Sequence, residues 1–300
     1  MNFLQNRFKW TLRYQGQLYA FLVPYLVGTF VLVVVPALAT AVLAFTEFKG
    51  VEIPQWVGFR NFVRVIESPL IRLSLYNTFM FVAAAVPLRL IGALLLALLL
   101  QQKGRLFGLY RAAVYLPTII PEVAYALIWL WIFNPVYGPL NIFLRALGLP
   151  APDWLVNEDT ARFAFVILAT FQIGEGFIVL LVGLQNIPRS LYEAAEVDGA
   201  NWWQAFWRIT LPLLMPWLLL LTFRDLLMSI QETFTPSYVM TYGGPYYATT
   251  FVPLLIYEIS FDYQDLGLAT ALLFLTFMIV AFIIMVIMSV TGLSGEADDV

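Results

Sequence analysis

The side chains that could do chemistry in this sequence are six ionisable residues inside long apolar stretches: Arg89, Glu122, Glu175, Arg224, Asp225 and Glu232. A charged side chain at the centre of a bilayer costs roughly 2.5–3.5 kcal/mol on insertion scales, so each must face protein or water. Paired acids such as Glu175 and Glu232 could serve acid–base catalysis, as in a membrane-embedded enzyme. The sequence contains no Cys and no His, however, which removes thiol nucleophiles, imidazole bases and most zinc sites. We therefore expect no catalytic and no metal centre.

Two other roles for these charges stay open. In the first, Arg89, Arg224 and Asp225 form structural ion pairs; neighbours 224 and 225 cannot share a helix face, so each is expected to have a partner on another helix. In the second, polar side chains line a cavity whose carboxylates and amides bind solute hydroxyls: Gln172, Glu175, Gln231, Glu232 and Thr233. Glu122 is expected near the cytoplasmic end of its apolar run and Glu232 closer to the outer face.

The composition identifies the solvent that surrounds these groups. Hydrophobic residues make up 61% of the 300 residues and charged residues 12%, against roughly 45–50% and about 25% in soluble proteins. So few charges cannot cover a water-exposed surface of this size, and the excess apolar surface must face lipid. A net charge of -3 without a long basic block excludes a nucleic-acid binder. The 16% of aromatic residues mostly predicts anchoring at membrane interfaces.

Six apolar runs are long enough to cross a bilayer as helices: 18–46, 73–101, 112–134, 163–187, 209–235 and 266–293. They are too long for barrel strands and lack two-residue alternation. The prediction is an all-α integral membrane protein with six transmembrane helices, kinked at internal prolines such as Pro121 and Pro216. A cytoplasmic N-terminal segment (1–17) and a cytoplasmic tail (294–300) flank the membrane domain (18–293).

The N-terminus is not expected to be a cleaved signal peptide. The apolar run that follows Arg7, Lys9 and Arg13 is about twice as long as a signal core. Basic residues near the ends of the spans favour the side of the N-terminus by eight to six, and basic residues prefer the cytoplasm. With an even number of spans, both termini are predicted to be cytoplasmic.

The loop between the fourth and fifth spans predicts a short helix over 189–201. Ser190 can be its N-cap, Glu193 can complete a capping box, and Gly199 suits the left-handed residue that ends a helix. A polar helix of about two turns is not stable alone in water, so a partner surface is needed. The alternative is that Glu193 only caps its own helix.

The spacing around this helix resembles a known signature. Glu193-Ala194-Ala195, three residues, Gly199, nine residues, Ile209, one residue and Leu211-Pro212 match the "EAA" motif of permease subunits of binding-protein-dependent ABC importers. The chain is similar to the sugar branch of that family, which includes the maltose and glycerol-3-phosphate permeases. Further similar segments are Gly58-Phe59-Arg60-Asn61-Phe62, Asn77-Thr78, Leu116-Pro117 and Thr241-x-Gly243-Gly244-Pro245.

The resemblance implies a type I importer permease fold in the inner (cytoplasmic) membrane and a path for a sugar or oligosaccharide. It implies a second homologous permease, two ATP-binding-cassette ATPase subunits and an extracytoplasmic solute-binding protein as partners. The EAA helix would dock in an ATPase cleft through Glu193, Ala194, Ala195, Asp198 and Gly199. Polar residues late in the fifth span would help to bind the solute.

The cofactor prediction follows from a missing motif. No Gly-x-x-x-x-Gly-Lys phosphate loop occurs in the sequence, so ATP and Mg²⁺ are expected in the partner ATPase and no cofactor in this chain. Two alternatives remain: an ABC importer of a non-sugar solute, such as a polyamine or a phosphate ester, and an ion-coupled secondary transporter. In the latter the EAA segment would have no role.

Overall fold

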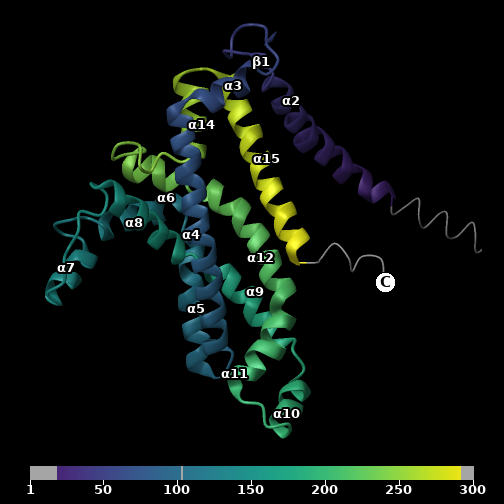
Figure 1. Ribbon diagram of the computed structural model, residues 1–300, viewed down its shortest axis with the longest axis vertical. Helices are drawn as coiled ribbons and strands as arrows, with labels where there is room; N and C mark the ends of the chain where they lie inside the picture. The colour runs from purple at the N-terminus through teal and green to yellow at the C-terminus, as the bar shows by residue number, and fades with distance from the viewer. Residues whose placement is uncertain (1–18, 103, 292–300) are drawn as a thin grey trace, which may run out of the picture. The chain divides into compact units, whose positions relative to one another are not determined.

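The computed structural model describes residues 19–102 and 104–291, and only the backbone of Arg105 (Figure 1). The predicted N-terminal segment 1–17, with Arg7, Lys9 and Arg13, and the predicted tail 294–300 lie outside the described residues. The chain divides into two compact units, residues 1–65 with 259–275 and residues 66–258 with 276–300. The predicted domain boundaries stay a prediction, and each unit is described by itself.

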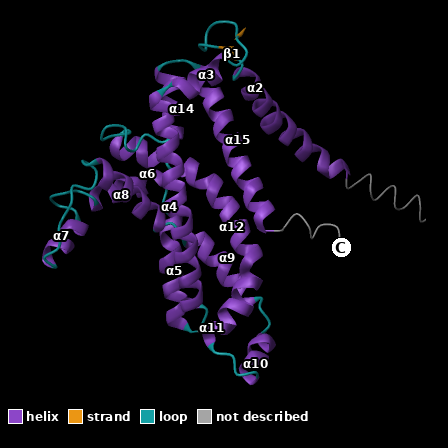
Figure 2. Ribbon diagram, viewed as in Figure 1, coloured by secondary structure: helices purple, strands orange, loops and turns teal. Residues whose placement is uncertain are grey.

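Four continuous helices are long and apolar enough to cross a membrane. They are Tyr19–Leu43, with η1 (Phe30–Val34) and α2 (Val35–Leu43); α4 (Pro69–Leu100); Trp202–Thr241; and α15 (Leu266–Thr291). The 40-residue helix Trp202–Thr241 runs through α11 (Trp202–Ala205), η2 (Phe206–Thr210), α12 (Leu211–Glu232), α13 (Phe234–Pro236) and η3 (Ser237–Thr241). Figure 2 shows how helix dominates the described chain, which confirms the predicted all-α class.

Two bent helix pairs raise the number of candidate spans from four to six. The first is Leu106–Ile119 with Glu122–Ile132, which belong to α5 (Arg105–Ile119) and α6 (Glu122–Ile132) and meet at 103°. The second is α8 (Glu158–Thr170) with α9 (Gly174–Gln185), which meet at 43°. The number of predicted spans is matched if each pair counts as one span.

The predicted continuous run 112–134 is wrong as a single helix. The backbone of Ile120 is extended, with φ -69° and ψ 129°, and α5 ends there. Ile120 precedes Pro121, and the ring of a proline disfavours the helical conformation of the residue before it. A kink was expected at Pro121; the structure has a complete break, and a new helix starts at Glu122.

In the unit formed by residues 66–258 and 276–300, α4 is the central element and packs against α8, α9 and α12 (Figure 1). Small residues on α4 allow the close approach of α9, since Ala93 and Ala97 lie in one buried cluster with Phe177 and Leu180. A second cluster joins α4 to α8 through Phe81, Phe165 and Phe251. The remaining helices of this unit are α7 (Pro139–Ala146), α10 (Arg189–Val197) and α14 (Val252–Tyr257).

Two of the similar segments meet inside this unit. The Asn77 amide donates to the main-chain oxygen of Tyr247 at 2.8 Å, and the Thr78 hydroxyl accepts from the Val252 N–H at 2.9 Å. Gly243 has a left-handed φ of 80°, and a Cβ there would lie 2.3 Å from the Thr250 hydroxyl oxygen. Asn77-Thr78 therefore hold the loop that contains Gly243-Gly244-Pro245.

The other unit contains a two-stranded antiparallel sheet, β1 (Thr46–Glu47) and β2 (Gln55–Trp56), with Thr46 opposite Trp56. The first part of α3 (Arg60–Glu67) follows, and η4 (Glu258–Asp262) precedes α15. Buried Asn61 donates to the carbonyls of Ala44 at 3.1 Å and Thr46 at 2.8 Å. The Gly58–Phe62 segment therefore fixes the turn after the first helix.

Candidate functional site

The larger unit contains a polar cavity of about 190 Å³. Its lining comes from α4, α5, α6, α8, α9, α12 and α13 and from the turns between them: Arg89, Thr118, Ile120, Glu122, Tyr125, Leu168, Gln172, Glu175, Arg224, Glu232 and Pro236. Five of these side chains carry a formal charge. The cavity therefore gathers five of the six ionisable residues that the apolar runs contain.

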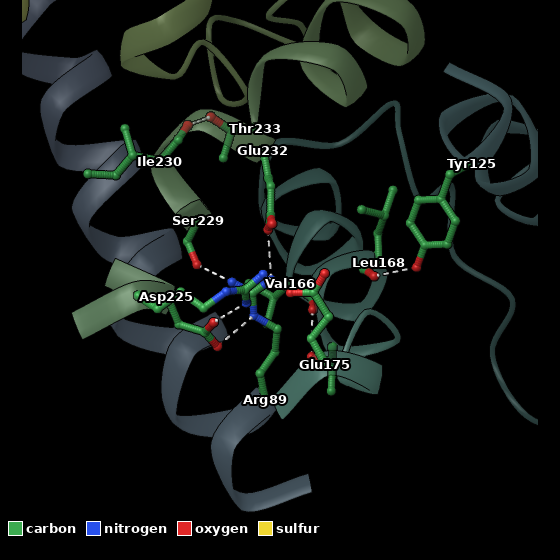
Figure 3. A network of polar contacts seen from close by, with 12 residues as sticks. Arg89, Tyr125, Val166, Leu168, Glu175, Asp225, Ser229, Ile230, Glu232 and Thr233 are labelled. Carbon is green, nitrogen blue, oxygen red and sulfur yellow. Dashed lines mark hydrogen bonds and ion pairs between the residues drawn. The ribbon is translucent and has the colours of Figure 1, made fainter. Parts of the chain in front are cut away.

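Arg89 links α4 to α12 (Figure 3). Its guanidinium is buried and donates from Nη1 to Glu232 Oε2 at 2.8 Å and from Nη2 to the Ser229 hydroxyl. Its Nε lies 3.5 Å from Asp225 Oδ2, an ion-pair contact without a hydrogen bond. Asp225, Ser229 and Glu232 are spaced by four and three residues, so they share one face of α12.

Arg224 links α12 to α9. Its Nη2 donates to Glu175 Oε2, and its Nη1 donates to Asp225 Oδ1 at 3.0 Å. Each of the neighbours 224 and 225 therefore has a partner on another helix, Glu175 for the arginine and Arg89 for the aspartate. The direct contact between them was not expected from helix geometry; the long Arg224 side chain reaches back to its neighbour. One ion-pair network thus joins three helices.

The break between α5 and α6 turns Glu122 into the cavity. Glu122 Oε2 accepts a hydrogen bond from the Thr235 hydroxyl at 2.8 Å, and the Tyr125 hydroxyl donates to the Leu168 carbonyl at 2.8 Å. Glu122 was expected near the cytoplasmic end of a span and Glu232 nearer the outer face, but both line one cavity. Glu122, Thr118 and Tyr125 were not predicted as lining residues; for Glu122, an acid next to Pro121 in an apolar run was the available signal.

The residues predicted for the solute path do not all reach this cavity. Gln172, Glu175 and Glu232 line it. Gln231 is exposed and is not among the lining residues, while Thr233 is buried and donates its hydroxyl to the Ile230 carbonyl at 2.7 Å. Successive helical residues point about 100° apart, so three consecutive positions cannot all face one cavity.

The predicted coupling helix is α10, which starts at residue 189 as predicted, but its N-cap differs from the prediction. The helix begins at Arg189, after an N-cap at Pro188 that makes no side-chain cap bond. Ser190 therefore lies inside the first turn, and Glu193 makes an ion pair with Arg189 at 3.1 Å in place of the expected capping box. The N-cap therefore lies two residues before the predicted one at Ser190.

The role of Gly199 at the end of α10 follows the prediction, although the helix ends at Val197 and not at the predicted residue 201. Gly199 has a left-handed φ of 78°. The Ala200 N–H donates to the Ala195 carbonyl at 2.9 Å and the Gly199 N–H to the Glu196 carbonyl at 3.0 Å, the two bonds of a Schellman motif. A capping box exists at the start of the next helix, α11, where the side chains of Asn201 and Gln204 each accept a hydrogen bond from the other residue's main-chain N–H.

The surface of α10 is open. None of its residues is buried; the Glu193 side chain is 63% exposed, and Ala194 and the following Asp198 are exposed. The Tyr192 hydroxyl lies 2.9 Å from the Thr210 hydroxyl and ties α10 to η2. The helix projects from one end of its unit (Figure 1), with its motif residues free of contacts that would bury them.

The chain is similar to known membrane-transport proteins over most of its length. Residues 89–291 match the family described as binding-protein-dependent transport system inner membrane component. The probable ABC transporter permease protein YesP of Bacillus subtilis is 36% identical over 90% of this chain and 88% of its own length. The trehalose/maltose transport system permease protein MalF of Thermococcus litoralis is 33% identical over 87% and 89%.

A solved structure has the same fold. A chain of a bacterial alginate ABC transporter, crystallised in complex with an alginate pentasaccharide-bound periplasmic protein, matches with a TM-score of 0.79 at 23% identity. The match covers 92% of this chain and 93% of that one, which confirms the predicted importer-permease fold. This chain therefore belongs to the family of binding-protein-dependent transport system inner membrane components and is a multi-pass membrane permease of the ABC type.

Proposed function

We propose that this chain forms one half of the membrane path of an ATP-driven importer for a sugar or oligosaccharide. The observation that carries the proposal is the exposed helix α10, which presents Glu193, Ala194 and Ala195 with none of its residues buried. Support for a saccharide comes from the relative named for trehalose and maltose. Further support comes from the cavity in the larger unit, whose carboxylate and amide groups can bind the hydroxyls of a sugar.

The partners follow from what one chain lacks. Six spans supply half of a closed path, so a second homologous permease completes it. Two ATP-binding-cassette subunits bind on the cytoplasmic side, one at each coupling helix, and hold the ATP and Mg²⁺; this chain holds no cofactor. An extracytoplasmic solute-binding protein delivers the solute to the outer loops. Both termini of this chain lie in the cytoplasm.

The contacts suggest how closure of the ATPase reaches the cavity. A pull on α10 acts on η2 through the Tyr192–Thr210 contact, and η2 continues without a break into α12. The helix α12 contributes Arg224 and Glu232 to the cavity. Their ion pairs with Glu175 and Arg89 connect α12 to α9 and α4, so these helices move together with it. A rigid-body motion of one short helix is thereby converted into a change of cavity access.

The test is a charge reversal on α10 in the complete transporter, reconstituted with its ATPase. Glu193→Lys should abolish ATP-driven uptake and solute-stimulated ATP hydrolysis, while the chain still inserts into the membrane. Arg189→Ala removes the intrahelical ion pair but keeps the Glu193 carboxylate, so it should retain most uptake. Gln101→Lys adds a positive charge at an exposed position just after α4, outside α10 and outside the outer loops, and should retain full uptake.

The two variants on α10 separate the two roles of Glu193. If the carboxylate only stabilises its own helix, Arg189→Ala would impair transport about as much as Glu193→Lys. Normal uptake by Glu193→Lys would refute docking through α10.

A further inference from the structure

The ionised groups around the cavity do not balance. Four carboxylates, those of Glu122, Glu175, Asp225 and Glu232, face two guanidinium groups. Each guanidinium is already shared between two carboxylates, Arg89 between Glu232 and Asp225, and Arg224 between Glu175 and Asp225. The excess charge on this side of the cavity is negative.

The hydrogen bonds within the protein use hydroxyl donors of the lining but leave carboxylate oxygens open. The hydroxyl protons of Tyr125 and Thr118 are given to the main-chain carbonyls of Leu168 and Tyr115. The described contacts of Glu122, Glu175 and Glu232 all use one oxygen, Oε2. Within the described part of the chain, the other carboxylate oxygens accept no hydrogen bond and remain available to a ligand.

A solute in this cavity therefore meets open carboxylate oxygens next to uncompensated negative charge, besides the remaining N–H groups of Arg224 and Gln172. Hydroxyl and ammonium groups donate to such a surface, and charge-assisted hydrogen bonds are about twice as strong as neutral ones. A carboxylate or phosphate on the solute would lie against like charge, a juxtaposition that costs affinity. The cost is larger in a site flanked by apolar helices than in water, because the effective dielectric constant is lower.

We propose that this half of the path selects saccharides by charge, so that an amine-bearing sugar binds most tightly, a neutral sugar less tightly and an anionic sugar most weakly. The inference rests on the proposed function, since it specifies the solute of the same cavity. Its direct grounds are the four carboxylates against two guanidinium groups, and the carboxylate oxygens left open by the protein's own hydrogen bonds.

The experiment measures binding to the complete permease pair with its ATPase in lipid nanodiscs, without the solute-binding protein, whose own specificity would otherwise enter. The probes are maltose, the disaccharide of glucosamine and the disaccharide of galacturonate. The expected order of affinity is glucosamine disaccharide, maltose, digalacturonate, with the amine bound at least about threefold more tightly than the neutral sugar even under solvent screening.

A variant links the preference to this chain. Glu122→Gln keeps an oxygen for the Thr235 hydroxyl but removes one negative charge, so the amine's advantage over maltose should fall by about threefold. Glu175→Gln repeats the test on α9. Glu158→Gln, at an exposed position of α8 that does not line the cavity, is the matched control and should leave the order unchanged.

The outcomes separate the two claims. Digalacturonate binding as tightly as maltose would overturn the charge preference and leave saccharide import intact. An unchanged amine preference in both Glu122→Gln and Glu175→Gln would show that other residues set the charge, and this too would overturn the inference. Failure of all three saccharides to bind would overturn the proposed function and the inference with it.

Discussion

At the scale of single residues, Arg89 is the most constrained charge in the described chain. Its side chain is 4% exposed and contacts two carboxylates and one hydroxyl of α12. A buried ion pair adds little net stability compared with apolar residues, but the removal of one partner leaves an uncompensated charge. Arg89 therefore matters less as a source of attraction than as the cation that compensates Glu232 and, together with Arg224, buried Asp225.

This gives a prediction for stability. Arg89→Met should lower the stability of the purified permease by about 3–5 kcal/mol, because half-buried Glu232 loses its cation and buried Asp225 keeps only that of Arg224. The measurement is thermal unfolding in detergent. Arg60→Met is the matched control: the Arg60–Glu47 pair is exposed at 68% and 44%, and its loss should change stability by less than about 1 kcal/mol.

A double variant checks the cause. Arg89→Met combined with Glu232→Met removes one of the stranded carboxylates and should recover part of the lost stability. A double variant less stable than the single variant would show that the loss comes from packing around the arginine stem and not from unpaired charge.

At the scale of elements, two helices that contribute to the cavity lining, α5 and α9, approach each other closely at Gly174. A Cβ at this position would lie 2.9 Å from both Tyr115 Cα and the Thr118 hydroxyl oxygen. Real Cβ atoms do not come this close to backbone, so the glycine sets the distance between the helices that carry Thr118 and Glu175. The same position begins α9 after its bend from α8.

Gly174→Val is therefore expected to push α5 and α9 apart, which should lower both the unfolding temperature and the binding of solute. Gly108→Ala is the control on α5, where a Cβ would meet nothing within 4 Å. Alanine favours helix over glycine by about 0.8–1.0 kcal/mol, so this variant should be equally or slightly more stable. Normal stability and binding in Gly174→Val would contradict the close contact of the two helices.

At the scale of the whole molecule, the prediction concerns which side of the membrane reaches the cavity. The sequence contains no cysteine, so Gln172→Cys places a single thiol in this chain, at the cavity wall. A polar thiol reagent should label it from the cytoplasmic side without nucleotide and from the outer side when ATP is trapped. Labelling is measured on this chain after separation from its partners.

The control is Leu149→Cys, at an exposed position of the loop between α7 and α8, which should react from the outer side in both states. If Gln172→Cys reacts from the same side with and without trapped ATP, the cavity does not alternate. A Leu149→Cys thiol that reacts only from the cytoplasm would reverse the proposed orientation.

Local sequence signals predicted some elements well. The end of α10 at Gly199 was predictable because a left-handed residue is a local requirement. Its N-cap at Pro188 was not, because the capping-box pattern of Ser190 and Glu193 favoured Ser190. The break before α6 was underestimated: Pro121 signalled a kink, but an angle of 103° depends on what the two helices pack against.

The class of the protein follows from sequence by itself. Composition and the length of apolar runs determine that the chain lies in a membrane, because transfer of apolar surface into lipid depends on amount and not on arrangement. The spacing from Glu193 to Pro212 determines the family, because the residues of the motif lie in one continuous stretch of the chain and can be recognised without the tertiary structure.

Only the tertiary structure decided which charges meet. Arg89 and Glu232 are 143 positions apart and touch at 2.8 Å, while adjacent Gln231 is exposed outside the cavity lining and Thr233 is buried and bonded to its own helix. Such pairing depends on the rotation, depth and bending of several helices at once, and those are set by packing among residues distant in sequence.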